Sequence, residues 1–266
     1  MMEKKRILIL VKVEPAPSKK YGSTVCTAGI TEDGEFIRLY PIPFSLFCDK
    51  DRKFSKYDWI ECECEKAEPG DDARKESYKV KADSIHVVGH IDTDYRWAER
   101  NNIVRPHISR NFKELVAEGS SLGIIRPKEV LKFVNEPVHQ DEDEAIDKEC
   151  KKCFQMIFNK SGEMLKIPEI GPLNTYYRYH FKCEDDDSLH AIMCEDWELY
   201  ESARSWISTY KTDEATWKAI HNKYFREFCD KKDLCFVVGT HHIYKTWMII
   251  GVYYPPKGSL DINPWF

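Results

Sequence analysis

Short apolar segments separated by turn residues fill the first part of the chain and constrain its fold more than any other feature. Residues 7–13 are almost continuously apolar, and the segments 24–30 and 36–40 flank an Asp-Gly dipeptide at 33–34 that is typical of a hairpin turn. Residues 59–65 alternate apolar with acidic side chains, which indicates a strand buried on one face. Five or six such strands within roughly 85 residues are typical of a small closed β-barrel.

Helical patterns begin in the region that follows these strands. Thr93 and Asn111 stand where helix N-caps are expected, before a segment that runs to Arg100 and a short amphipathic segment at 112–117. The second half repeats strand and helix patterns, with a strand at 176–183, helices at 196–210 and 216–229, and a hairpin that joins 234–239 to 247–254. We therefore predict an α+β fold with two β-barrel units and connecting and packing helices.

The acidic run at 141–144 is the clearest predicted domain boundary. We place the division just before this run, which gives an N-terminal barrel with a helical connection over 1–135 and a C-terminal β/α unit over 136–256. Residues 257–266 then form a tail, which the double proline at 255–256 is expected to project away from the body.

The charge balance excludes a generally basic nucleic-acid-binding protein. The chain carries 40 Lys and Arg against 45 Asp and Glu, a net charge of −5, which still leaves room for a local basic groove. No apolar run is long enough to span a membrane, and the apolar segment near the start is too short for a secretory signal. We expect a cytoplasmic protein without a membrane partner, whose 10 cysteines are reduced thiols.

The tail contains the clearest functional signal. Ile262 is followed by the adjacent aromatic residues Trp265 and Phe266. One turn of 3₁₀ helix places residues i and i+3 on the same side, so Ile262 and Trp265 would project together with Phe266 beside them. This pattern predicts a compact hydrophobic peptide that another protein binds. The alternatives are a frayed tail and a tail folded back onto the core.

The same residues resemble the clamp-binding peptide (PIP box) of archaeal and eukaryotic replication and repair proteins, whose pattern is Gln-x-x-aliphatic-x-x-aromatic-aromatic. Ile262, Trp265 and Phe266 match three of its four anchor positions, whereas Ser259 stands in place of Gln and Pro264 is a further departure. The resemblance implies a sliding clamp as partner, bound more weakly than by an ideal peptide. It also implies that replacing Ser259 by Gln would tighten binding.

Several segments spread over most of the chain resemble an uncharacterised group of prokaryotic proteins: 25–30, 36–44, 56–60, 76–78, 196–198, 236–240 and 247–256. Members of this group are similar to dual OB-fold proteins, and some of them end in short clamp-binding tails. The resemblance implies an OB-like barrel in each unit and assigns no activity.

A candidate nucleic-acid-binding face consists of cationic and aromatic residues of the first barrel, namely Lys19, Lys20, Tyr21, Arg38 and Tyr40. Arg38 and Tyr40 are two positions apart on one predicted strand, so they are expected to share a face. On an OB barrel, aromatic rings stack on bases and cations contact phosphates, which predicts binding to single-stranded or damaged DNA. The alternative is an aromatic strand with solvated lysines.

The predicted hairpin turn at 241–245 contains two His residues followed by Ile, Tyr and Lys. Its side chains are of the kinds that contact a ligand or a phosphate, and the alternative is a plain polar turn.

Zinc is the cofactor that the cysteines suggest. Cys150 and Cys153 form a C-x-x-C pair, which supplies two of the four ligands of a zinc knuckle. Cys183, His190 and Cys194 are the candidates that complete the site. The alternative is a set of unliganded side chains.

Asp196 and Glu198 are the candidate catalytic carboxylates, as part of a divalent-metal site or as a general base. Because they stand at the start of a predicted helix, the alternative is that they complement the helix dipole. Glu76 and Lys79 suggest a metal-dependent nuclease, although their spacing is E-x-x-K rather than E-x-K. The chain contains no Walker A loop and no G-x-G-x-x-G, H-E-x-x-H or G-x-S-x-G motif.

These features lead to one main functional hypothesis and two alternatives. The main hypothesis is a clamp-associated nucleic-acid-binding protein that acts in DNA replication, repair or defence. One alternative is a metal-dependent nuclease or modified-base enzyme recruited by the same tail. The other is a reader of small molecules or modified bases without a clamp role. Whether the chain is an enzyme stays open.

Overall fold

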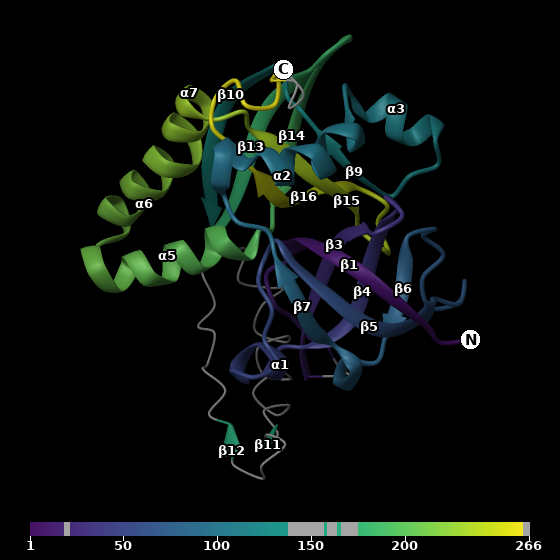
Figure 1. Cartoon of the computed structure of the whole chain (residues 1–266). Coiled ribbons are helices and arrows are strands. Elements are labelled where there is room, and N and C mark those ends of the chain that lie inside the picture. Colours follow the sequence, from purple (N-terminus) through teal and green to yellow (C-terminus); the bar gives the residue numbers. More distant parts are fainter. Residues whose placement is uncertain (19–21, 138–156, 159–163, 166–174, 263–266) are drawn as a thin grey trace. The chain divides into compact units, whose positions relative to one another are not determined.

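The computed structural model describes residues 1–18, 22–137, 157–158, 164–165 and 175–262 (Figure 1). The chain divides into two compact units. Unit 1 consists of Met1–Ala73, Ser77–His90 and Pro137–Asn174, and unit 2 of Arg74–Glu76, Ile91–Glu136 and Thr175–Phe266. The acidic run expected to mark the boundary, 141–144, lies outside the described residues.

Unit 1 is built on a closed β-barrel. Its strands are β1 (Glu3–Lys12), β3 (Gly22–Thr31), β4 (Phe36–Pro43), β5 (Asp58–Lys66) and β6 (Ser77–Val80). Strand β1 pairs with both β3 and β5, β3 pairs with β4, and β6 joins β4 to β5, which closes the circle. The β4–β6 pair is parallel and the other pairs are antiparallel. The predicted α+β class, with a barrel in the first part of the chain, is therefore confirmed.

The other described elements of unit 1 are short. They are β2 (Ala16–Ser18), α1 (Ser45–Cys48), η1 (Ala82–Ser84), β7 (His86–His90), β11 (Ile157–Phe158) and β12 (Met164–Leu165). Strand β2 pairs with β3, β7 pairs with β5, and β11 pairs with β12.

The barrel core explains the alternating pattern of residues 59–65. Ile60, Cys62 and Cys64 are buried in one hydrophobic cluster. The intervening residues Glu61 and Glu63 form ion pairs with Lys4 and Lys81, respectively. Aliphatic residues of β1 and β4 join the same cluster: Ile7, Ile9, Ile37, Leu39 and Ile42. Burying an aliphatic side chain of this size stabilises the fold by roughly 1.5–3 kcal/mol.

Gly29 permits the close approach of strands β1 and β3. A Cβ atom at this position would lie 2.2 Å from the carbonyl oxygen of Leu8 and 2.8 Å from Cγ2 of Ile7. Glycine inside a strand often marks such a close backbone approach. The side chain of any other residue would force β3 away from β1.

Unit 2 is built on a second sheet, with the strand order β10-β13-β14-β16-β15-β9-β8. Its strands are β8 (Ile108–Ser109), β9 (Leu122–Ile125), β10 (Glu129–Pro137), β13 (Thr175–Cys183), β14 (Asp186–Cys194), β15 (Cys235–Thr240) and β16 (Trp247–Tyr253). The β14–β16 and β8–β9 pairs are parallel, and the β13–β14, β15–β16 and β9–β15 pairs are antiparallel. A second barrel in this unit stays a prediction.

The helices of unit 2 are α2 (Asp94–Val104), α3 (Phe112–Ala117), α5 (Trp197–Tyr210), α6 (Asp213–His221) and α7 (Phe228–Lys231), with a 3₁₀ turn, η2 (Arg105–His107), and a π-helical segment, η3 (Asn222–Glu227). The side chains of Asn111, Asp196 and Thr212 cap α3, α5 and α6 by accepting a backbone N–H. Because Thr212 provides this cap, the helical run expected to begin at residue 216 begins earlier.

The start of α2 differs from the helix expected after Thr93. The Thr93 side chain makes no capping hydrogen bond among the described residues, and residues 95–97 have left-handed backbones with φ between 48° and 66°. Each left-handed residue costs about 1–2 kcal/mol. Tertiary packing opposes this cost, since the Trp97 ring lies 5.5 and 5.4 Å from the rings of Tyr253 and Tyr254.

In the part of the chain that the structure describes, we find no helix with both the length and the apolar character needed to cross a membrane.

Candidate functional site

The structure does not place Arg38 and Tyr40 on one exposed face. Arg38 is 2% exposed, and its guanidinium donates a hydrogen bond of 3.2 Å to Oγ of Ser77 on β6. Tyr40 is exposed, and its hydroxyl accepts from Oγ1 of Thr24 at 3.4 Å. Pairing of β6 with β4 buries Arg38, and this pairing had no signal in the local sequence. Three further candidates lie outside the described residues: Lys19, Lys20 and Tyr21.

The described zinc candidates do not converge. Strands β13 and β14 form a hairpin in which Cys183 pairs with Asp186 near the turn, while Cys194 pairs with Tyr177 at the far end. His190 pairs with Phe181 between these two ends, and its Nε2 lies 3.4 Å from Oδ2 of Asp186. The described residues contain no group of three or more His, Cys, Asp or Glu side chains that could hold a metal ion. The remaining two candidates, Cys150 and Cys153, lie outside the described residues.

The carboxylate of Asp196 is fully buried and both of its oxygens accept backbone hydrogen bonds. Oδ1 accepts from N–H of Glu198 at 2.8 Å and Oδ2 accepts from N–H of Val252 at 2.7 Å. These bonds cap α5 and connect the start of the helix to β16. Glu198 is half-buried, and its carbonyl accepts from the Tyr224 hydroxyl at 3.0 Å. The geometry around Asp196 therefore fits a structural carboxylate.

Glu76 and Lys79 have separate partners. The Glu76 carboxylate is buried and accepts from N–H and Oγ of Ser121 at 3.0 and 2.5 Å. Lys79 pairs with Asp71. The two residues therefore do not form a shared acidic and lysine site.

The C-terminal segment, residues 257–262, is docked on unit 2 and does not project from the double proline. N–H of Lys257 donates to the carbonyl of Lys231 at 3.0 Å, and Gly258 has a φ of 75° that turns the chain. Ser259 and Leu260 are each 4% exposed. The expectation that the tail 257–266 projects away from the body is wrong for residues 257–262, because their polar groups bind partners in the fold.

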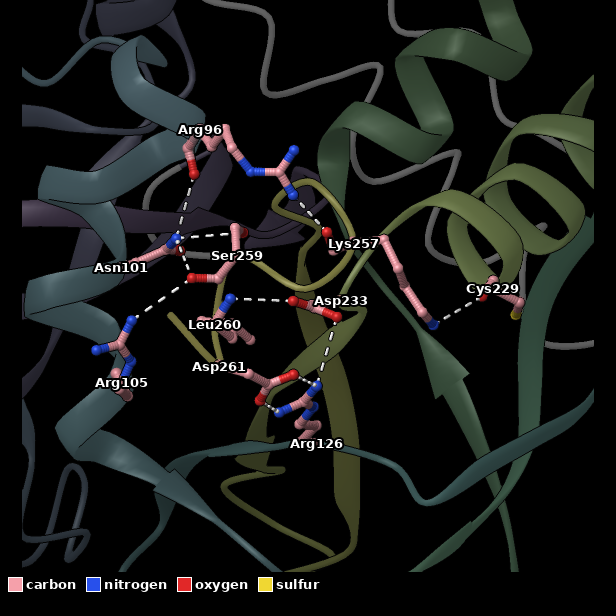
Figure 2. A network of polar contacts seen from close by, with 10 residues as sticks. All are labelled: Arg96, Asn101, Arg105, Arg126, Cys229, Asp233, Lys257, Ser259, Leu260 and Asp261. Carbon is pink, nitrogen blue, oxygen red and sulfur yellow. Dashed lines mark hydrogen bonds and ion pairs between the residues drawn. The ribbon is translucent and has the colours of Figure 1, made fainter. Parts of the chain in front are cut away.

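One group of contacts joins the segment to helix α2 and turn η2 (Figure 2). Nδ2 of Asn101 lies 3.3 Å from both the carbonyl oxygen and Oγ of Ser259, and Asn101 is itself 2% exposed. Nη2 of Arg105 donates to the carbonyl of Ile262 at 2.7 Å. Arg96 donates to the carbonyl of Lys257. Helix α2 and turn η2 thus bind main-chain oxygens of Lys257, Ser259 and Ile262.

A second group of contacts joins the segment to Arg126 and Asp233 (Figure 2). Oδ2 of the buried Asp233 accepts from N–H of Leu260 at 3.0 Å. The Arg126 guanidinium binds both carboxylate oxygens of Asp261, at 2.7 and 3.1 Å, and lies 3.4 Å from Oδ1 of Asp233. The hydrogen bond from Arg126 lowers the pKa of Asp261 below its ordinary value. A two-point pair of this kind fixes orientation as well as charge.

The anchored segment overlaps the first half of the clamp-like motif, from Ser259 to the main chain of Ile262. Exposure rises from 4% at Leu260 to 50% at Ile262, the aliphatic position of the motif. Ser259, the position of Gln in the clamp-binding pattern, is buried and bound by the protein itself. Trp265 and Phe266 lie outside the described residues. The arrangement therefore holds the base of a short hydrophobic peptide at a fixed place on unit 2.

Sequence reasoning did not find the residues that hold the segment: Asn101, Arg105, Arg126 and Asp233. Each contacts a residue of the segment that lies at least 27 positions away in sequence, and no local motif marks them. Only the folded unit 2 brings them together.

Two family models match the chain. One, described as domain of unknown function DUF8758, matches residues 3–106, and another, described as domain of unknown function DUF8757, matches residues 108–264. The second match covers more than half of the 266 residues. No curated protein matches the chain. The two matched ranges meet at the end of η2. In the structure, the chain passes from unit 1 to unit 2 earlier, between His90 and Ile91.

Proposed function

Because the chain belongs to the DUF8757 family, whose description states no activity, we propose a function from its own residues: a clamp-associated nucleic-acid-binding protein of DNA replication, repair or defence. The observation that carries this proposal is the anchored segment 257–262, from which the hydrophobic motif continues.

Anchoring of the segment favours binding of the residues that follow it. Ordering a free peptide on a partner costs conformational entropy, and a base that is already fixed reduces that cost. Aromatic side chains that fill pockets often dominate interface energies, at roughly 2 kcal/mol or more each. Ile262, Trp265 and Phe266 would supply these contacts to a sliding clamp. Ser259 would instead belong to the anchor, which accounts for the absence of Gln at that position.

The topology of the first barrel supports the nucleic-acid part of the proposal. Strands taken in the order β1-β3-β4-β6-β5 and back to β1, with a parallel β4–β6 pair, form a five-stranded barrel. We infer that this barrel is an OB-fold, a class of barrel that binds oligonucleotides on one strand face and its adjoining loops. The enzyme alternative has no comparable support, since both oxygens of Asp196 accept backbone hydrogen bonds.

Calorimetric titration of the full chain with an archaeal sliding clamp tests the proposal. We expect binding by the unmodified chain and at least a 100-fold loss when Trp265 and Phe266 are both replaced by Ala, as expected from about 2 kcal/mol or more for each ring. Tyr210→Ala is the matched control, because it removes an exposed aromatic ring elsewhere, on α5. Failure of the unmodified chain to bind, or equal binding by the double variant, would overturn the clamp role.

A further inference from the structure

The turn between β15 and β16 has a defined structure. N–H of His241 donates to the carbonyl of Thr246 at 2.8 Å, and N–H of Lys245 donates to the carbonyl of His241 at 3.1 Å. Nδ1 of His241 accepts from N–H of Ile243 and of Tyr244 at 3.2 and 3.3 Å. Accepting these bonds requires that Nδ1 carry no proton, so the ring is held in one tautomer and one orientation.

This turn presents stacked rings to solvent. The Tyr244 ring stacks on the His241 ring with centroids 4.9 Å apart and an angle of 24° between planes. The His242 ring lies 5.0 Å from that of His241 on the same turn. Tyr244 is 74% exposed and Ile243 is 62% exposed. A large aromatic surface is therefore supported by a fixed neighbour and accessible to a partner.

The charge around these rings is positive. Residues 239–247 include no Asp or Glu, and Lys245 is part of the turn. Arg74, which is part of unit 2, donates from its guanidinium to the carbonyl of Thr240, where β15 ends. Burial, the neighbouring His242 ring, Arg74 and Lys245 all lower the pKa of His241. This local balance differs in sign from the net charge of −5 for the whole chain.

An exposed ring with cations beside it matches the chemistry of a single nucleic-acid strand. Each base offers a flat π-face, and stacking on a protein ring tolerates any base sequence, while Lys and Arg attract the phosphates. The carboxylates of an acidic peptide would pair with the cations, but they offer no flat π-face to stack on the aromatic surface.

We propose that the hairpin turn 241–245, with Arg74 beside it, is a base-stacking contact for single-stranded nucleic acid. Tyr244 stacks on a base, and Lys245 contacts the adjoining phosphate. This inference rests on the proposed nucleic-acid-binding function and gives that function a site in unit 2.

Fluorescence anisotropy with a labelled oligothymidylate at low salt tests the site in the full chain. We expect Tyr244→Ala to weaken binding by about tenfold or more, whereas Tyr244→Phe, which keeps the ring, stays within about twofold. Lys245→Ala should weaken binding and reduce its salt dependence, because one phosphate contact is lost. Tyr210→Ala is again the control, as an exposed aromatic ring on α5. Unchanged melting temperatures would confirm that each variant is folded.

The outcomes separate this inference from the function on which it rests. If the unmodified chain binds the oligonucleotide and Tyr244→Ala binds it equally well, the hairpin site is refuted. The proposal that the protein binds nucleic acid would then still stand. Failure of the unmodified chain to bind the oligonucleotide would refute both, while the clamp titration would be unaffected. A parallel titration with vesicles of phosphatidylcholine and phosphatidylserine tests a membrane role. If Tyr244→Ala weakens binding to the vesicles but not to the oligonucleotide, the inference is also overturned.

Discussion

Replacing Asn101 by Ala should release the C-terminal segment from unit 2. Nδ2 of Asn101 lies 3.3 Å from the carbonyl oxygens of Arg96 and Ser259 and from Oγ of Ser259. Its Oδ1 accepts from the hydroxyl of the buried Tyr253. The variant therefore removes a side chain that binds helix, sheet and segment together.

The expected loss in the free energy of unfolding is about 2–4 kcal/mol. The contacts of Nδ2 are long, so each contributes near the low end of the net range of about 0.5–1.5 kcal/mol per hydrogen bond. The Tyr253 hydroxyl also loses its hydrogen bond to Oδ1 of Asn101 inside the fold, and losing a buried partner costs about 1–3 kcal/mol. Asn102→Ala is the matched control, because Asn102 is adjacent in sequence and exposed. It should change stability by less than about 0.5 kcal/mol.

Urea unfolding measures the global effect, and amide hydrogen exchange measures the local one. In Asn101→Ala, the amides of Ser259 and Leu260 should exchange faster than the loss of global stability accounts for, because the segment detaches before the unit unfolds. Exchange of these two amides that changes only in step with global unfolding would refute the anchoring role of Asn101.

Three further changes test other parts of the fold. Ser259→Gln should lower the melting temperature and should not tighten clamp binding, because a larger side chain does not fit a position that is 4% exposed; a stable variant with higher clamp affinity would contradict the anchor. Gly29→Ala should destabilise the barrel by more than about 2 kcal/mol in urea unfolding, since its Cβ would lie 2.2 Å from the Leu8 carbonyl oxygen. Gly70→Ala is the control and should have little effect on stability, because its Cβ has no neighbour within 4 Å. An equal loss in the free energy of unfolding in the two variants would exclude the steric clash at Gly29 as its cause. Arg126 lowers the pKa of Asp261 below its ordinary 3.8, so the stability from this pair is present above that pH and lost as pH falls through the folded-state value. The protection factor of the Leu260 amide, which is its intrinsic exchange rate divided by its observed rate at the same pH, should therefore fall below about pH 4. The effect is limited to about 1 kcal/mol because the Asp261 carboxylate is mostly exposed. Asp261→Asn should lose this pH dependence, and the same fall in the variant would exclude the pair as its cause.

The parts of the fold that follow from local pattern could be predicted from sequence. The alternation of residues 59–65 correctly indicated one buried face, because strand periodicity acts within a single segment. Asn111 caps its helix as expected, since the capping bond joins residues three positions apart. The Asp-Gly turn at 33–34 also connects paired strands, β3 and β4.

The parts that depend on distant contacts could not be predicted. Strand periodicity placed Arg38 and Tyr40 on one face, but pairing with β6, which lies 39 positions from Arg38, buries the arginine. The left-handed backbone of residues 95–97 opposes local propensity and is compatible with the fold because Trp97 packs against Tyr253. The segment after residue 256 has a sequence typical of a free tail, and its anchors are visible only in the folded unit.

The contact between Asn101 and Ser259 has a consequence for how the protein is made. It joins residues 158 positions apart, so it is among the most non-local contacts in unit 2. Closing so long a loop costs conformational entropy, so contacts of this kind slow folding. During synthesis, residue 101 leaves the ribosome well before residue 259, so the anchor cannot close until nearly all of unit 2 has been made. Binding of Ser259 to Asn101 therefore distinguishes a folded unit 2 from a chain that is still being synthesised.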